Sequence, residues 1–135
     1  MIRTFFIKQI HMKKVIATEN APKAVGPYSQ AIEVNGTLYI SGQIPVNPAD
    51  GQVQTEITAA AHQSLKNIGA ILAEAGMTYD NVVKTTVLLA DIADFKAVNE
   101  VYAEYFTGDK PARACYQAAA LPLGVKVEIE AIAVR

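Results

Sequence analysis

Apolar residues recur along this chain with two different spacings, and each spacing predicts one kind of secondary structure. Between residues 57 and 75 they recur every third or fourth position, which is typical of one face of a helix. Thr55 is placed to cap the start of this helix, and Gly76 to end it in a left-handed conformation. A second apolar stripe, from Phe95 to Phe106, predicts another helix. Each helix therefore has one face that must be buried against another element.

Segments rich in β-forming residues lie on both sides of the two helices. The dipeptide Asn35-Gly36 separates two of them and predicts a tight hairpin. Val82 to Ala90 is rich in Val, Thr and Leu, which predicts a strand buried on both faces. The remaining predicted strands cover residues 15–17, 31–34, 37–41, 112–119 and 125–134. This order of elements predicts an α+β fold, with a mixed β-sheet and two helices packed on one of its faces.

Two helices would leave the second face of this sheet uncovered. If that face also carries valine, isoleucine and leucine, leaving it wet would forfeit roughly 25 cal/mol per Å² of apolar area. Closed association of several copies would remove this area from water. The sequence therefore predicts a homo-oligomer.

Length and charge narrow the classes of protein. The chain has 135 residues, enough for one domain, which we place at residues 12–135 because Met12 opens the segment that reads as folded protein. Residues 1–11 are predicted to be an N-terminal extension that is disordered or results from an upstream start. The formal net charge of -1 disfavours nucleic acid as a partner, and no apolar stretch is long enough to span a membrane.

Cysteine and histidine are scarce. Cys115 is the only cysteine, so the chain has no internal disulfide, and a reducing, cytoplasmic compartment is the simplest expectation. The two histidines, His11 and His62, do not have the spacing of metal ligands, so no metal is expected. His62 lies on the polar flank of the first helix and is expected to be solvated.

Two strands carry residues suited to chemistry on a small acid. Side chains alternate along a strand, so Arg113 and Cys115 share one face of theirs, and Glu128 and Glu130 share one face of the last strand. Arg113 is either a surface salt-bridge partner or a bidentate carboxylate ligand. Cys115 is either a thiolate nucleophile or a small buried residue, and the second reading is favoured because no histidine is near in sequence. A glutamate partly withdrawn from water is the best candidate for general acid and base.

Several ordered blocks of sequence together resemble the reactive-intermediate deaminase family, also called the RidA or YjgF-type family of enamine and imine deaminases. The similarity extends from about Lys13 to Arg135. Its blocks are Thr18-Glu19-Asn20-Ala21-Pro22, Gly26-Pro27-Tyr28-Ser29-Gln30, Ser41-Gly42-Gln43-Ile44-Pro45, Phe95-Lys96-Ala97-Val98-Asn99, Pro111-Ala112-Arg113-Ala114-Cys115 and Val127-Glu128-Ile129-Glu130-Ala131.

The resemblance implies a chorismate-mutase-like fold assembled as a homotrimer, with active sites in clefts between subunits. By position, Arg113 matches the arginine that binds the substrate carboxylate, and Glu128 matches the acid associated with the reacting water. The positions that match substrate-binding residues are Tyr28, Ser41, Gly42, Asn99, Arg113 and Cys115. Gly42 suits a place where the backbone must approach the ligand closely.

The activity that the resemblance implies is that of a 2-iminobutanoate/2-iminopropanoate deaminase. Such an enzyme hydrolyses 2-aminoacrylate, 2-iminopropanoate and 2-iminobutanoate to 2-oxo acids and ammonia, and it needs neither metal nor cofactor. Two alternatives remain open. One is an RNA-binding protein or endoribonuclease acting as a translation inhibitor, which the near-neutral charge and the lack of an aromatic ladder disfavour. The other is a non-catalytic regulatory trimer that binds a small ligand in the same pocket.

Overall fold

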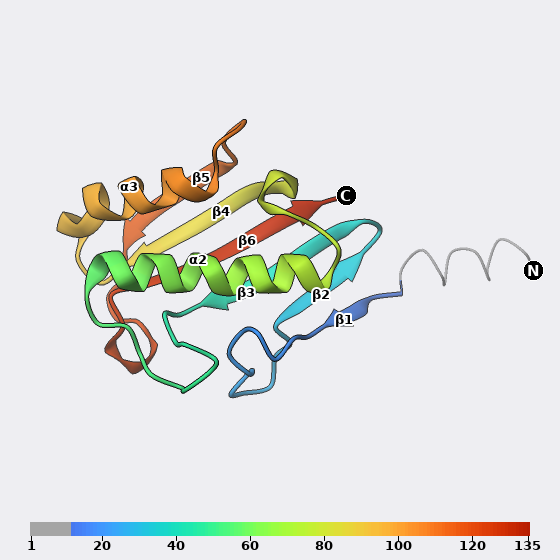
Figure 1. Cartoon of the computed structure of the whole chain (residues 1–135), viewed down its shortest axis with the longest axis horizontal. Coiled ribbons are helices and arrows are strands. Elements are labelled where there is room, and N and C mark those ends of the chain that lie inside the picture. The colour runs from blue at the N-terminus through green and yellow to red at the C-terminus, as the bar shows by residue number, and fades with distance from the viewer. Residues whose placement is uncertain (1–11) are drawn as a thin grey trace, which may run out of the picture.

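The computed structural model describes residues 12–135, which form a six-stranded sheet with two helices on one face (Figure 1). Residues 1–11, predicted to be an N-terminal extension, lie outside the described part of the chain. The strands are β1 (Lys14–Ile16), β2 (Ala31–Val34), β3 (Thr37–Gln43), β4 (Val82–Leu89), β5 (Ala112–Gln117) and β6 (Val127–Val134). The helices are α2 (Ile57–Glu74) and α3 (Phe95–Tyr105), and short 3-10 turns are η1 (Tyr79–Asn81), η2 (Ile92–Asp94) and η3 (Pro122–Gly124). The predicted α+β architecture is confirmed.

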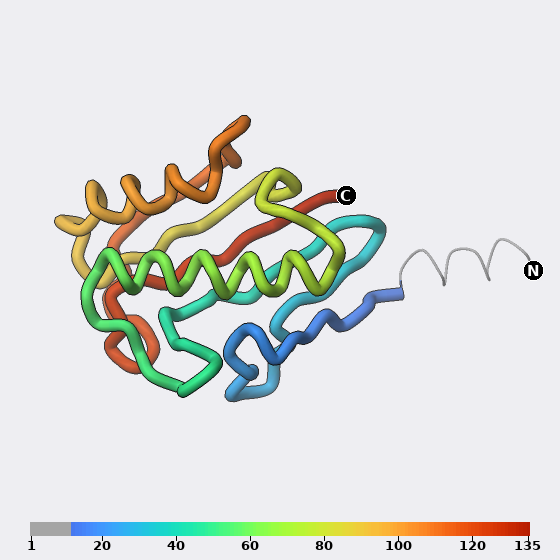
Figure 2. The backbone as a smooth tube through the Cα atoms, in the orientation of Figure 1, coloured from blue at the N-terminus to red at the C-terminus, as the bar shows by residue number. Residues whose placement is uncertain are grey.

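The strands are ordered β1-β2-β3-β6-β4-β5 across the sheet, and their path can be followed in Figure 2. β2 and β3 form the predicted hairpin, in which Asn35 and Gly36 both have positive φ, 51° and 78°. β4 and β5 are parallel and are connected through α3, whereas the other adjacent pairs are antiparallel. The last strand of the chain, β6, therefore lies inside the sheet between β3 and β4.

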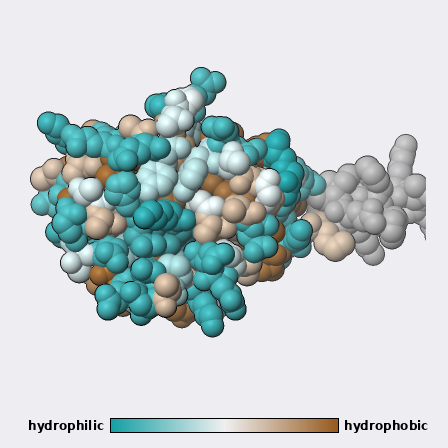
Figure 3. Space-filling model, viewed as in Figure 1, coloured by the Kyte–Doolittle hydropathy of each residue, from teal (hydrophilic) through white to brown (hydrophobic). Residues whose placement is uncertain are grey.

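The core lies between the helices and the sheet. Leu65, Ile68 and Leu72 on one face of α2 are fully buried, as are Val127 and Ile129 of β6 beneath them. The outward surface on the helix side is mainly hydrophilic (Figure 3). No helix among residues 12–135 combines the length and the apolar character needed to cross a bilayer.

The face of the sheet that points away from the helices, which we call the open face, is not covered within residues 12–135. The prediction that β4 is buried on both faces is wrong for a single chain. Val87 and Leu89 are buried on the helix side, but Lys84 points to the open face and is exposed. Tyr39 and Tyr116 also lie on the open face and are about half exposed.

The start of α2 differs from the prediction that Thr55 caps it. Glu56 is the N-cap, because its carboxylate accepts hydrogen bonds from Thr58 N at 3.0 Å and Ala59 N at 2.9 Å. A carboxylate also favours the positive end of the helix dipole, which an uncharged threonine hydroxyl does not. The predicted end is confirmed, because Gly76 follows the helix with a φ of 72°.

The sequence predicts that His62 of α2 is solvated, but the structure shows contacts to α3. Its Nδ1 lies 2.7 Å from the Tyr105 hydroxyl on α3, and its Nε2 lies 3.7 Å from a carboxylate oxygen of Glu104. The imidazole therefore joins the two helices, and its observed contacts indicate a structural role.

Candidate functional site

Arg113 is positioned by β5 and α3. In the β4–β5 register it lies beside Thr85, a buried residue on the helix side of the sheet, and its side chain reaches α3. Arg113 Nη1 donates a 2.7 Å hydrogen bond to Asn99 Oδ1 on that helix. An amide oxygen does not neutralise a guanidinium, and Arg113 has no salt-bridge partner among residues 12–135. The positive charge is therefore held in place without being compensated by this part of the chain.

Two aromatic rings of α3 hold the same guanidinium. Arg113 Cζ lies 4.8 Å from the ring centroid of Tyr102 and 5.5 Å from that of Phe95, close enough for each ring to attract the cation. Tyr102 is fixed in turn by a 2.7 Å hydrogen bond between its hydroxyl and Thr85 Oγ1. A planar guanidinium with a fixed orientation is suited to binding a carboxylate through two hydrogen bonds.

Cys115 lies on the same face of β5 as Arg113 and packs partly buried against the core. Burial raises the pKa of the Cys115 thiol, and the nearby charge of Arg113 lowers it by less. A thiol with a raised pKa is protonated at neutral pH and is a poor nucleophile. This environment supports the packing role of Cys115 over covalent catalysis.

Glu128 points to the open face, because its neighbours Val127 and Ile129 are buried under the helices. Its carboxyl group lies against the backbone of Gly42 in β3. A Cβ added to Gly42 would lie 2.9 Å from Glu128 Cδ and closer still to Oε2. A glycine is therefore required at this position if the carboxylate is to keep its place.

Two physical causes raise the pKa of the Glu128 carboxyl. The larger is burial, which penalises the charged form, and the smaller is the negative charge of Glu130 on the same face of the strand. A carboxyl whose pKa is raised toward neutrality exchanges protons readily with a substrate or a water molecule. Of the two candidate glutamates, Glu128 has the environment of a general acid and base.

Ser41 ties β3 to the loop that carries Tyr28. Ser41 Oγ donates a 2.6 Å hydrogen bond to Ser29 O, and Ser41 N donates a 2.9 Å bond to Gln30 O. The Tyr28 side chain itself is 50% exposed. The loop thus places an accessible phenol beside the strand that contains Gly42.

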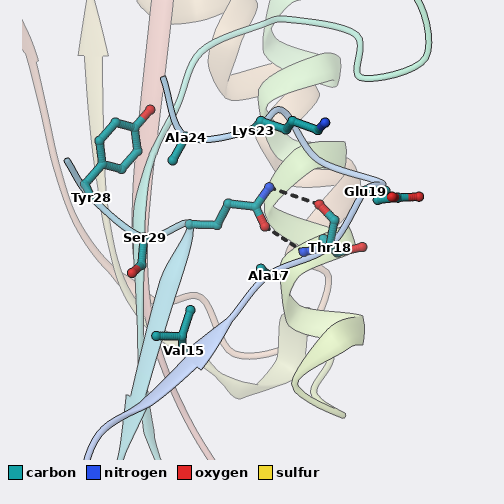
Figure 4. A pocket seen from close by; sticks show the side chains of 9 residues that line it. Val15, Ala17, Thr18, Glu19, Lys23, Ala24, Tyr28 and Ser29 are labelled. Carbon is teal, nitrogen blue, oxygen red and sulfur yellow. Dashed lines mark hydrogen bonds between the residues drawn. The ribbon is translucent and has the colours of Figure 1, made fainter. Parts of the chain in front are cut away.

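Gln30 anchors this loop and was not identified as a positioning residue from the sequence. The oxygen of its buried side-chain amide accepts a hydrogen bond from Thr18 N at 2.7 Å, and the amide nitrogen donates one to Thr18 O at 3.0 Å. Dashed lines at Thr18 in Figure 4 mark these two bonds. It also donates to Ala21 O and Pro22 O at 3.2 and 2.8 Å. The Gly-Pro-Tyr-Ser-Gln block contains the signal, since a glutamine after a turn can bond several carbonyls, but the bonded partners depend on the fold.

Tyr28 and Gly42 line a pocket of about 340 Å³, which we call the Gly42 pocket. Its wall also contains Val25 and Leu123. The volume falls within the range of small-molecule sites, roughly 300–1,000 Å³. Gly42 is the link between the two features, since it lines the pocket and also lies against the Glu128 carboxyl.

The predicted site residues fall into two groups in one chain. The arginine half-site consists of Asn99, Arg113 and Cys115, and the glutamate half-site consists of Tyr28, Ser41, Gly42 and Glu128. Arg113 lies on the helix side of the sheet and Glu128 on the open face, on strands that flank β4. A single chain therefore does not bring the two charged residues together. Among residues 12–135 there is no group of three His, Cys, Asp or Glu side chains placed to bind a metal ion.

Comparison with known proteins gives consistent matches over nearly the whole chain. A family model described as Endoribonuclease L-PSP matches residues 18–135. A Mus musculus protein named 2-iminobutanoate/2-iminopropanoate deaminase is 58% identical over 125 residues, which cover 92% of this chain and 93% of the mouse protein.

Solved structures match in fold as well as sequence. YyfA from Yersinia pestis, a protein of the conserved Rid family, has 51% sequence identity and a TM-score of 0.90, covering 92% of this chain and 100% of that chain. TdcF from E. coli, solved with bound serine, has 43% identity and a TM-score of 0.88, covering 90% of this chain and 98% of that one.

Proposed function

This chain belongs to the Endoribonuclease L-PSP family, and from that premise we propose that it hydrolyses reactive imines and enamines bearing a carboxylate to 2-oxo acids and ammonia. The substrates are 2-aminoacrylate, 2-iminopropanoate and 2-iminobutanoate. Relatives at 50–58% identity carry the name 2-iminobutanoate/2-iminopropanoate deaminase, and TdcF binds serine, itself an amino acid with a carboxylate. The observation that carries the proposal is an arginine whose guanidinium is oriented by Asn99 and two rings without a carboxylate partner in the described residues.

The proposed reaction needs little covalent help, because a protonated imine carbon is already electrophilic. Arg113 binds the substrate carboxylate. Glu128 accepts a proton from a water molecule as the water oxygen adds to the imine carbon and forms a carbinolamine. Glu128 then gives that proton to the carbinolamine nitrogen. The C–N bond breaks as the hydroxyl oxygen forms the C=O bond and returns its proton to Glu128, and ammonia leaves with a 2-oxo acid as the other product. Cys115 packs beside Arg113 and forms no bond to the substrate.

The site is completed by a second copy of the chain in this proposal. The arginine half-site of one subunit meets the glutamate half-site of its neighbour, in a homotrimer with a chorismate-mutase-like fold. Two facts support this arrangement: the half-sites face opposite sides of one sheet, and the open face carries exposed aromatic side chains such as Tyr39 and Tyr116. Burying apolar area of this kind favours closed association.

A coupled assay tests the activity. A dehydratase generates 2-aminoacrylate or 2-iminobutanoate, and the purified protein is expected to speed ammonia release. Arg113→Ala should abolish the acceleration. Arg113→Lys should retain only part of it, because lysine lacks the planar guanidinium that binds a carboxylate through two hydrogen bonds. Cys115→Ala should keep most of the activity. Equal rates for the wild type and Arg113→Ala would contradict the assignment.

The description of the matching family model favours endoribonuclease activity as a second candidate. Arg113 would then hold a phosphate in place of a carboxylate. The net charge of -1 counts against this candidate, since RNA affinity rests largely on basic surface. Cleavage of single-stranded RNA that disappears in Arg113→Ala would support it, and intact RNA after incubation with active deaminase would exclude it.

A further inference from the structure

The turn that leads into β6 has an unusual residue in a left-handed conformation. Leu123 has φ 56° and ψ 16°, and Gly124 follows with φ 65°. Val125 N bonds back to Pro122 O at 3.2 Å, which closes a turn of the I′ kind. Such turns favour Asn, Asp or Gly at the first of their two central positions, because other side chains meet the backbone there. The turn geometry therefore does not explain the leucine.

The same chain forms this turn a second time with the favoured residues. In the β2–β3 hairpin, Asn35 and Gly36 take φ values of 51° and 78°, close to those of Leu123 and Gly124. The two turns thus differ at the first central residue, which is asparagine in one and leucine in the other. A strained residue persists when something other than the local backbone requires it, so a role for the side chain is indicated.

The Leu123 side chain is placed where it can contact a ligand. It is 76% exposed and lines the Gly42 pocket, as does Val25, which is 92% exposed. These are the two most exposed large apolar residues in the described part of the chain. The Gly42 pocket therefore has an apolar rim formed by two separate loops.

We propose that Leu123 is a specificity residue, whose side chain contacts the carbon chain of the imine and favours longer aliphatic substrates over the shortest. This inference rests on the proposed function. With the carboxylate bound to Arg113 and water delivered at Glu128, the remaining substituent of the imine carbon is the alkyl chain. Gly42, which lies against the Glu128 carboxyl, lines the Gly42 pocket, and the apolar rim of that pocket matches the alkyl substituent in chemistry.

The test compares one activity across substrates of increasing length. An amino-acid oxidase generates imines from alanine, 2-aminobutanoate and norvaline, and kcat/KM is measured from 2-oxo acid formation. Leu123→Asn suits the left-handed turn and removes the apolar contact, so the norvaline-to-alanine ratio of kcat/KM should fall by about three- to tenfold. Leu123→Gly should lower the ratio similarly, and Leu123→Met should preserve it. Because Asn and Gly relieve strain, both variants should melt no lower than the wild type.

A matched control separates contact with the substrate from general surface effects. Ile92→Asn replaces another exposed apolar residue that does not line the Gly42 pocket, and it should leave the ratio unchanged. An unchanged ratio in Leu123→Asn with an active wild type would overturn the role of Leu123 alone. A smaller molar mass of Leu123→Asn in light scattering would assign the side chain to subunit contacts and overturn it too. No activity in the wild type would remove the proposed function and this inference together.

Discussion

At the scale of single residues, Gly42 leaves the space that the Glu128 carboxyl occupies, because glycine has no side chain. The two residues lie on adjacent strands, and the space that a Cβ would need at Gly42 is filled by the Glu128 carboxyl. The obstructing atoms are the end of a flexible side chain, so a methyl group there would displace the carboxylate and spare the backbone. A substitution at Gly42 should therefore affect the reaction more than the stability of the fold.

Gly42→Ala should consequently reduce kcat at least tenfold while changing the free energy of unfolding by less than about 1 kcal/mol. Urea denaturation and the coupled ammonia assay measure the two quantities. Gly108→Ala is the control, because its added Cβ would lie 3.9 Å from Asp80 Oδ1, an ordinary van der Waals contact, and it should keep full activity. Full activity in Gly42→Ala would show that the carboxylate position is not required.

The raised pKa of Glu128 predicts the pH dependence of the reaction. Accepting a proton requires the ionised carboxylate, so kcat/KM should fall as pH drops through a pKa that lies above the ordinary value of 4.5. Glu130→Gln removes the smaller cause of the shift, and should move this acid limb to lower pH without abolishing activity. A limb that stays in place in Glu130→Gln would exclude Glu128 as the titrating group.

Thermal stability gives an independent check on the same shift. Because the folded-state pKa of Glu128 is raised, folding favours its protonated form, and ionisation lowers the free energy of unfolding as pH rises through that pKa. At pH 7, Glu128→Gln should therefore have a higher Tm than the wild type. The difference should shrink below pH 4.5, where residue 128 is neutral in the wild type as well as in the variant.

At the scale of elements, the contact between α3 and β5 determines the orientation of the arginine. Tyr102→Leu removes one of the two rings at Arg113, so KM for 2-iminobutanoate should rise about three- to tenfold with a smaller change in kcat. Tyr102→Phe keeps the ring but leaves Thr85 Oγ1 without its partner, and should cost about 1–2 kcal/mol of stability with KM nearly unchanged.

Tyr105→Leu is the control for this prediction, since it removes a ring from the same helix that contacts His62 and Tyr79 instead of Arg113. It should lower stability without raising KM. If Tyr102→Leu and Tyr105→Leu changed KM equally, the effect would come from the helix as a whole.

Most elements could be predicted because their signals are local. Asn35-Gly36 specifies its turn through the backbone preferences of two residues, and the apolar period of α2 follows from one face of one helix. The errors arise where the outcome depends on a neighbour. Glu56 replaces Thr55 as the cap because its longer side chain reaches two amides, and β4 has one uncovered face because its covering is not supplied within residues 12–135.

At the scale of the whole molecule, the relation between the two charged residues could not be predicted from the sequence. Alternation assigns Arg113 and Glu128 each to a face of its own strand. Whether those faces coincide depends on the register of both strands against β4, and a shift of one residue would reverse the answer. The observed register places them on opposite faces, which makes assembly the decisive question for function.

Mixing two inactive variants tests whether the site is shared. Arg113→Ala and Glu128→Gln proteins, each inactive alone, should regain activity when unfolded and refolded together. In a mixed trimer, some interfaces pair an intact arginine half-site with an intact glutamate half-site, and random assembly restores roughly a quarter of the sites in a closed ring. The control mixes Arg113→Ala with the double variant, which offers no interface with both residues and should stay inactive. Recovery only in the first mixture, with light scattering giving the mass of a trimer, requires that the two residues act from different subunits. A folded trimer without recovery would mean that one chain must supply Arg113 and Glu128 together. That result would contradict the shared site, because the two side chains lie on opposite faces of the sheet.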